Sequence, residues 1–126
     1  MTCFWDGLLR RLTKDDWKFV NHKVITSPKM FVGFLKSNMK DAKNILFQNL
    51  HLPVQFQREI VRDVQQYDER FIEQGHWTSA CDPFLIAVCV IFRLSITHRF
   101  AGNTVTLQHT NARRVLQCRS SRTHFY

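Results

Sequence analysis

The chain has 126 residues, of which 44% are hydrophobic, with 11 Phe but only 4 Gly and 3 Pro. This length and composition are typical of one folded domain over residues 1–126, and they exclude a disordered tail or a Gly/Pro-rich repeat. The formal net charge of +8 makes nucleic acid, an anionic membrane surface or another acidic partner worth testing. A solvated basic surface explains the same charge equally well.

The cysteines and the apolar runs indicate a cellular compartment and bear on whether a zinc site or a membrane span is present. None of the four cysteines forms a CxxC pair, so neither a structural zinc site nor a cofactor is predicted. No secretory leader is recognised, which favours a reducing, cytoplasmic location. The longest apolar run, over residues 83–92, is far below the ~20 residues that a membrane-spanning helix needs.

Helical patterns dominate the first half of the chain. Thr2 and Ser27 are residues that cap helices, and each precedes apolar positions at helical spacing. An irregular stretch is expected between these two helices, over residues 17–26. The predicted helices begin at Cys3 (to about residues 13–16), Pro28 (to about Met39), Asp41 (a short pattern through Leu50) and Pro53.

The second half changes from a buried helix to short strands. Asp82 and Pro83 predict the start of a helix that is apolar on every side, and such a helix is expected at the centre of the core. From Leu94 the apolar period becomes two, with a turn near 101–103. Further strands are predicted at Val115–Cys118 and His124–Tyr126. Helices first and a small antiparallel sheet last predict an α+β fold.

Cys3 and His124, near the two ends of the chain, are the candidate catalytic residues. The N-terminus of a helix stabilises a thiolate, and an imidazole on a facing strand can take its proton. Each residue alone is more often a buried thiol or a packing histidine. Trp5 and Trp77 are expected in the core.

The remaining histidines receive no functional role from the sequence. His98 and His109, considered with Cys118 as metal ligands, lack zinc spacing and are expected on the surface or on a sheet face. Three further histidines are assigned to loops: His22, His51 and His76.

Five short segments together resemble the OTU (ovarian tumour) family of cysteine proteases. The runs 75–77 (GHW), 82–88 (DPFLIAV) and 92–97 (FRLSIT) resemble the family's turn, buried helix and central strand. Cys3-Phe4-Trp5 resembles the start of its nucleophile helix, and His124-Phe125-Tyr126 resembles its histidine followed by an aromatic residue. The resemblance spans nearly the whole chain in the family's order.

The resemblance implies a papain-like fold and hydrolysis of peptide or isopeptide bonds. Cys3 would be the nucleophile, its backbone N–H an oxyanion donor, and His124 the general base and then acid. Substrates would be ubiquitin, a ubiquitin-like protein or a viral polyprotein. The family's Asp-Gly-Asn/Asp before the cysteine is replaced here by Met1 and Thr2, and no orienting acid is identified; Asp6 is a poor third member.

A non-catalytic binding module for RNA or another acidic partner is one alternative, and a structural piece of a longer polyprotein with no activity of its own is another. Residues 111–126 contain basic side chains and no acidic one, although stacking aromatics are sparse among them. The basic residues of this set are Arg113, Arg114, Arg119 and Arg122. The ubiquitin reading instead needs acidic side chains for the basic ubiquitin tail, and the candidates are Asp63, Asp68, Glu69 and Glu73.

Overall fold

The structure is a computed structural model, and it describes residues 2–121 and 123–126. Its helices are α1 (Cys3–Arg11), α2 (Lys14–Phe19), α3 (Pro28–Asn38), α4 (Val54–Gln65), the 3₁₀ helix η1 (Glu69–Gln74) and α5 (Pro83–Phe92). Its strands are β1 (Ile45–Phe47), β2 (Leu50–His51), β3 (Ser95–Phe100), β4 (Asn103–His109) and β5 (Val115–Ser120).

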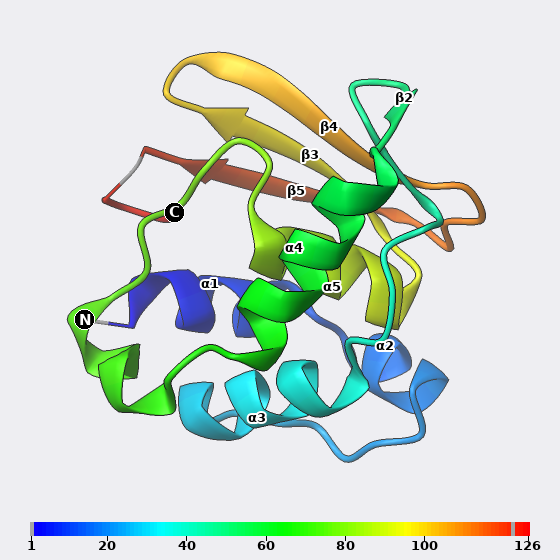
Figure 1. Cartoon of the computed structure of the whole chain (residues 1–126). Coiled ribbons are helices and arrows are strands. Elements are labelled where there is room, and N and C mark those ends of the chain that lie inside the picture. The colour runs from blue at the N-terminus through cyan, green and yellow to red at the C-terminus, as the bar shows by residue number, and fades with distance from the viewer. Residues whose placement is uncertain (1, 122) are drawn as a thin grey trace.

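The strands form one five-stranded sheet in the order β2-β1-β4-β3-β5, and the helices lie against one of its faces (Figure 1). The predicted α+β class is therefore confirmed. The prediction of a purely antiparallel sheet is wrong, because β5 pairs with β3 in parallel. After β4 the chain crosses to the other edge of β3, and there β5 runs in the same direction as β3. In β5, buried and exposed residues alternate, as expected when one face packs on helices.

Helix α5 forms the centre of the core, as its apolar sequence predicts. Most of its side chains are fully buried. Asp82 caps the helix: its Oδ1 accepts hydrogen bonds from the backbone N–H groups of Phe84 at 2.9 Å and Leu85 at 3.4 Å. Arg93 ends the helix in the left-handed conformation, and the chain enters β3 two residues later.

The first helix begins at Cys3 as predicted, but it ends at Arg11 and a second helix follows at once. Thr13 opens α2 with a capping box, in which its hydroxyl accepts from Asp16 N and Asp16 accepts from Thr13 N. The predicted irregular stretch thus starts only after Phe19. The capping box is a signal that the sequence contains and that the apolar pattern alone does not show.

The segment after Asp41 is a β-hairpin, and the predicted short helix there is wrong. β1 pairs with β2 and also with β4, where Ile45 lies opposite His109. Gln48 and Asn49 form the turn with positive φ values. The unpaired edge of β4 offers backbone hydrogen bonds that outweigh a weak helical pattern.

Two further expectations have mixed outcomes. Trp5 is fully buried, as predicted, whereas Trp77 is 73% exposed and the prediction for it is wrong. Within the described part of the chain, no helix is both long enough and apolar enough to cross a membrane.

Candidate functional site

The C-terminal segment packs along one face of α1, the helix that begins with Cys3. Cys3, Gly7 and Arg11 are spaced by four residues and so share this face. The Phe125 ring lies over Gly7: a Cβ at Gly7 would be 2.7 Å from Cε1 of Phe125 and nearer still to Cδ1. Only a glycine therefore accommodates Phe125, which is 2% exposed, in this position.

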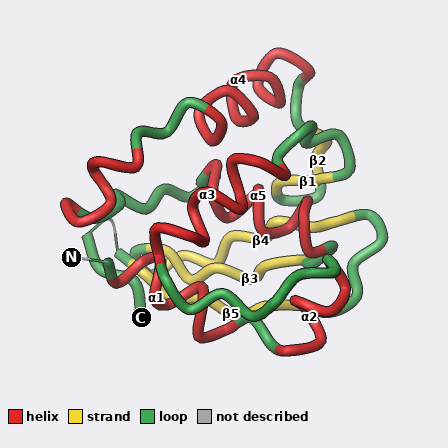
Figure 2. The backbone as a smooth tube through the Cα atoms, turned by 90° about the horizontal axis from the view of Figure 1, so that it is seen from below, coloured by secondary structure: helices red, strands yellow, loops and turns green. Residues whose placement is uncertain are grey.

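The contacts of the last two residues meet α1 at the level of Gly7. Tyr126 O accepts a hydrogen bond from Nη2 of Arg11, whose guanidinium folds back and donates through Nη1 to Gly7 O at 2.9 Å. The same guanidinium lies 5.2 Å from the centroid of the Phe125 ring. The C-terminal segment is therefore anchored about one helical turn from Cys3, and the beginning of α1 and the C-terminus lie on the same side of the molecule in two perpendicular views (Figure 1 and Figure 2).

The His124 side chain is exposed and faces away from Phe125. Phe125 forms a single antiparallel bridge with Ser120, so the predicted strand 124–126 is reduced to one pair. The His124 ring instead contacts the Tyr126 ring, with centroids 4.3 Å apart. No hydrogen bond joins Cys3 to His124, which are both described.

Cys3 occupies the first position of α1 and is partly exposed. Thr2 precedes it but makes no side-chain capping bond, because its hydroxyl donates to Oδ2 of Asp6 at 2.5 Å. The first backbone N–H groups of a helix have no partner within the helix. These groups, at the positive end of the helix dipole, are arranged to stabilise negative charge next to Cys3.

A buried histidine–aspartate pair, which the sequence did not single out, lies next to this helix. His76 Nε2 is 2.7 Å from Oδ2 of Asp82, and the His76 side chain is only 13% exposed. Its ring packs on Phe4, with centroids 4.3 Å apart, and on Trp5 at 5.5 Å. Phe4 also contacts Phe125, with ring centroids 5.0 Å apart, so the His76–Asp82 pair and the C-terminal segment both pack against the residue that follows Cys3.

The loop that carries His76 also carries an exposed aromatic. Asp82 fixes this loop through its Oδ2 atom, which accepts a hydrogen bond from Ser79 N at 3.1 Å and another from the His76 ring. Trp77, between them in sequence, is largely exposed. Only the tertiary contacts reveal this arrangement, because His76 and Asp82 are six positions apart in an irregular segment.

The other three cysteines are in environments that suppress thiolate formation. Burial raises the pKa of Cys81 and of Cys118 to about 11. Burial also raises the pKa of Cys89, which is fully buried, further still. These thiols therefore serve as internal controls for any reactivity at Cys3.

His98 is completely buried on a face of the sheet, in β3, which is one of the two placements predicted for it. Its Nε2 lies 2.6 Å from Oγ of Ser120. Burial lowers the pKa of His98, so the neutral form is favoured. Among residues 2–121 and 123–126 no group of three His, Cys, Asp or Glu side chains is placed to hold a metal ion.

Two arginines of the predicted anion-binding set are held inside the fold. Arg113 Nη2 donates to Asp16 Oδ1 at 2.9 Å and to Phe92 O at 2.7 Å. Arg114 Nη2 donates to Asp16 Oδ2 at 2.5 Å. Arg119 lies over the Tyr126 ring, with Cζ 4.6 Å from its centroid, and Arg122 lies outside the described residues. The three arginines that the structure describes therefore do not form a shared free surface.

Some of the acidic residues considered for a basic ubiquitin tail have basic neighbours. Asp68 forms a salt bridge with Arg70 at 2.7 Å, and Glu69 lies 3.5 Å from Lys36. Asp63 is 3.9 Å from Arg62.

Comparisons of this chain with protein-family models, with curated proteins and with solved structures found no match.

Proposed function

We propose that this chain is a cysteine-dependent peptidase or isopeptidase of the OTU type, with Cys3 as nucleophile and His124 as general base. The observation that carries the proposal is the packing of the C-terminal segment on α1 at Gly7, about one helical turn from Cys3. His124 precedes Phe125 in this segment, and its nearness to the helix that begins with Cys3 supports a role for it as the base. The α+β architecture and the OTU-like segments support the same reading.

In this mechanism the His124 ring turns from Tyr126 toward α1 and accepts the proton of the Cys3 thiol. The thiolate attacks the carbonyl carbon of the scissile bond, and the developing oxyanion is stabilised by backbone N–H groups of α1. The imidazolium then donates its proton to the leaving amine as the C–N bond breaks. Water hydrolyses the resulting thioester and restores the thiol. Catalytic hydrogen bonds are often not closed in the absence of substrate.

Trp77 would contact the substrate near this site. It is exposed on a loop that the buried His76–Asp82 pair anchors to Phe4, the residue next to Cys3. An exposed aromatic on an anchored loop provides a rigid apolar contact at little entropic cost. We therefore assign Trp77 to binding and His76 to positioning of the loop.

Covalent capture tests the proposal. The chain is incubated with ubiquitin and ubiquitin-like proteins whose C-termini carry a cysteine-reactive electrophile, and adducts are detected by mass. We expect one adduct, lost in Cys3→Ala and slowed at least ~100-fold in His124→Ala. Trp77→Ala is expected to slow capture by about tenfold.

Matched variants distinguish this chemistry from incidental reactivity. Cys81→Ala removes a half-buried thiol and His51→Ala an exposed histidine, and both are expected to react like the parent chain. An adduct that persists in Cys3→Ala, or the absence of any adduct from the folded chain, would contradict the proposal. Normal capture in His124→Ala would contradict its role as the general base.

A further inference from the structure

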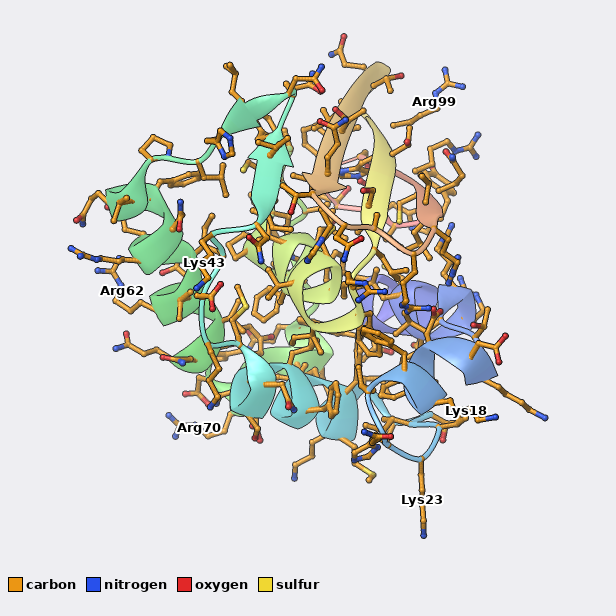
Figure 3. All side chains as sticks on the ribbon, turned by 90° about the vertical axis from the view of Figure 1, so that its right-hand side faces the viewer. Lys18, Lys23, Lys43, Arg62, Arg70 and Arg99 are labelled. Atoms are coloured by element: carbon orange, nitrogen blue, oxygen red, sulfur yellow. The ribbon has the colours of Figure 1, made fainter. Side chains whose placement is uncertain are left out.

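A basic groove with an apolar floor lies between α4 and the connection that joins α3 to β1. It encloses about 340 Å³, and none of its lining residues belongs to α1 or to the C-terminal segment. Val54, Val61 and Ala42 supply apolar surface. Lys43 and Arg62 lie on this side of the molecule, away from Lys18 and Lys23 (Figure 3).

The charges that line the groove are strongly one-sided. Four basic side chains contribute to it, from Lys40, Lys43, Arg58 and Arg62, against one carboxylate, Asp41. Within the described residues, the side chains of Lys40, Lys43 and Arg58 have no ion pair or hydrogen bond. Arg62 has only the exposed Asp63, 3.9 Å away. Unpaired like charges around a concave surface repel one another, and an acidic ligand would relieve this repulsion.

The walls of the groove are fixed by hydrogen bonds from glutamine side chains of α4. Gln65 Nε2 donates to Met39 O at 2.7 Å, and Gln57 Nε2 donates to Leu52 O at 2.8 Å. These bonds hold α4 to the chain on either side of β1 and β2. A ligand that enters the groove therefore meets a surface that is already formed, so little entropy is lost by ordering it.

We propose that this groove binds an acidic peptide segment of a partner protein, with apolar side chains interleaved between the acidic ones. The apolar side chains would contact Val54 and Val61, and the carboxylates would pair with the surrounding Lys and Arg residues. Single-stranded RNA fits less well, because no aromatic side chain lines the groove for a base to stack on. This inference is independent of Cys3 and of any hydrolytic activity.

Selection of peptides from a random displayed library on the full chain tests the proposal. We expect enriched peptides that contain at least two Asp or Glu interleaved with apolar residues. Their affinity should fall as the salt concentration rises. The double variant Lys43→Glu/Arg62→Glu should weaken their binding at least ~10-fold.

The control is Lys18→Glu/Lys23→Glu, which makes the same change of net charge on another part of the surface (Figure 3). All four side chains are exposed, and circular dichroism checks that both double variants fold. Equal losses in the two double variants would show a non-specific charge effect and overturn the proposal. Enrichment of peptides without acidic residues, no enrichment at all, or groove-dependent binding of oligouridine RNA in place of the peptides would also overturn it.

Discussion

Two contacts, one on each side of β5, join the end of the chain to its first helices, and they differ in chemistry. Before β5, Arg113 and Arg114 donate to the buried carboxylate of Asp16 in α2. After β5, Phe125 fills the space above Gly7 in α1. The first contact depends on charge and hydrogen-bond direction, and the second on the shape of the site around the ring, where Phe4 and the Arg11 guanidinium also contact Phe125.

The comparison shows that arginines of the basic segment 111–126, predicted to bind an acidic partner, can instead stabilise the fold. A single buried acid from a helix almost 100 residues earlier in the chain holds two arginines of the segment. The aromatic contact, by contrast, leaves the neighbouring His124 exposed. The ionic contact therefore joins a buried carboxylate of α2 to the segment before β5, whereas the aromatic contact leaves the side chain next to it exposed.

The largest effect is expected from Asp16→Asn. It removes the negative charge that faces Arg113 and Arg114, and breaking a buried ion pair typically costs about 3–5 kcal/mol. The free energy of unfolding, measured with urea, should fall by about that amount. Asp15→Asn changes an exposed acid in the same helical turn and should stay within about 0.5 kcal/mol of the parent; equal losses would contradict the role of Asp16.

Gly7→Ala should break the aromatic contact at a cost of about 1–3 kcal/mol, because the new Cβ displaces the Phe125 ring. The same variant should slow capture at Cys3 if the segment carries the base. Gly33→Ala is the matched control, since a Cβ there would meet only Oε1 of Glu69 at 4.0 Å. It should gain about 0.5–1 kcal/mol from helix propensity. Destabilisation by both changes would argue against a specific contact at Gly7.

The ionic contact should also weaken in acid. Burial of the Asp16 carboxyl raises its pKa, but hydrogen bonds from Arg114, the Thr13 backbone and Arg113 outweigh burial and lower the pKa to about 2. Because the folded-state pKa is depressed, the stabilisation is complete above the ordinary value of 3.8 and is lost as pH falls through about 2.

Urea unfolding at several pH values measures this loss. We expect roughly 1–2 kcal/mol over the window, allowing for solvent screening near the partly exposed Arg114. The part of the pH dependence of the free energy of unfolding that Asp16 causes should be absent in Asp16→Asn. An unchanged slope in that variant would show that other groups cause the acid sensitivity.

The smallest effect is expected beside the aromatic contact, at Arg119. Its guanidinium lies over the exposed Tyr126 ring, and such a contact contributes about 0.5–1 kcal/mol. Arg119→Ala should cost no more than that in thermal unfolding. Arg99 lies opposite Arg119 in the sheet, so Arg99→Ala, which relieves like-charge repulsion, should be neutral or slightly stabilising. A loss at Arg99 as large as that at Arg119 would contradict the ring contact.

By itself the sequence determined the elements whose signals are local. The start of α1, the capped starts of α3 and α5, the apolar run of α5 and the period-two strands β3, β4 and β5 were predicted because caps and periodicity act over a few residues. Thr2 makes no side-chain capping bond, so that part of the prediction for α1 is wrong. Cys3 was placed correctly at the first position of its helix for the same reason. Its pairing with His124 remains a prediction that rests on the resemblance and on the course of the last segment.

Only the tertiary structure decided the features that join distant residues. The parallel pairing of β5 with β3, the pairing of β1 with β4 and the burial of His98 depend on partners more than ten residues away. The structural role of Arg113 and Arg114 also depends on a distant partner, Asp16. Their basic sequence predicted a binding surface, whereas in the structure both side chains pair with this buried carboxylate. The charge pattern of the sequence does not predict these ion pairs, because tertiary packing and not spacing along the chain decides which residue pairs with a buried charge.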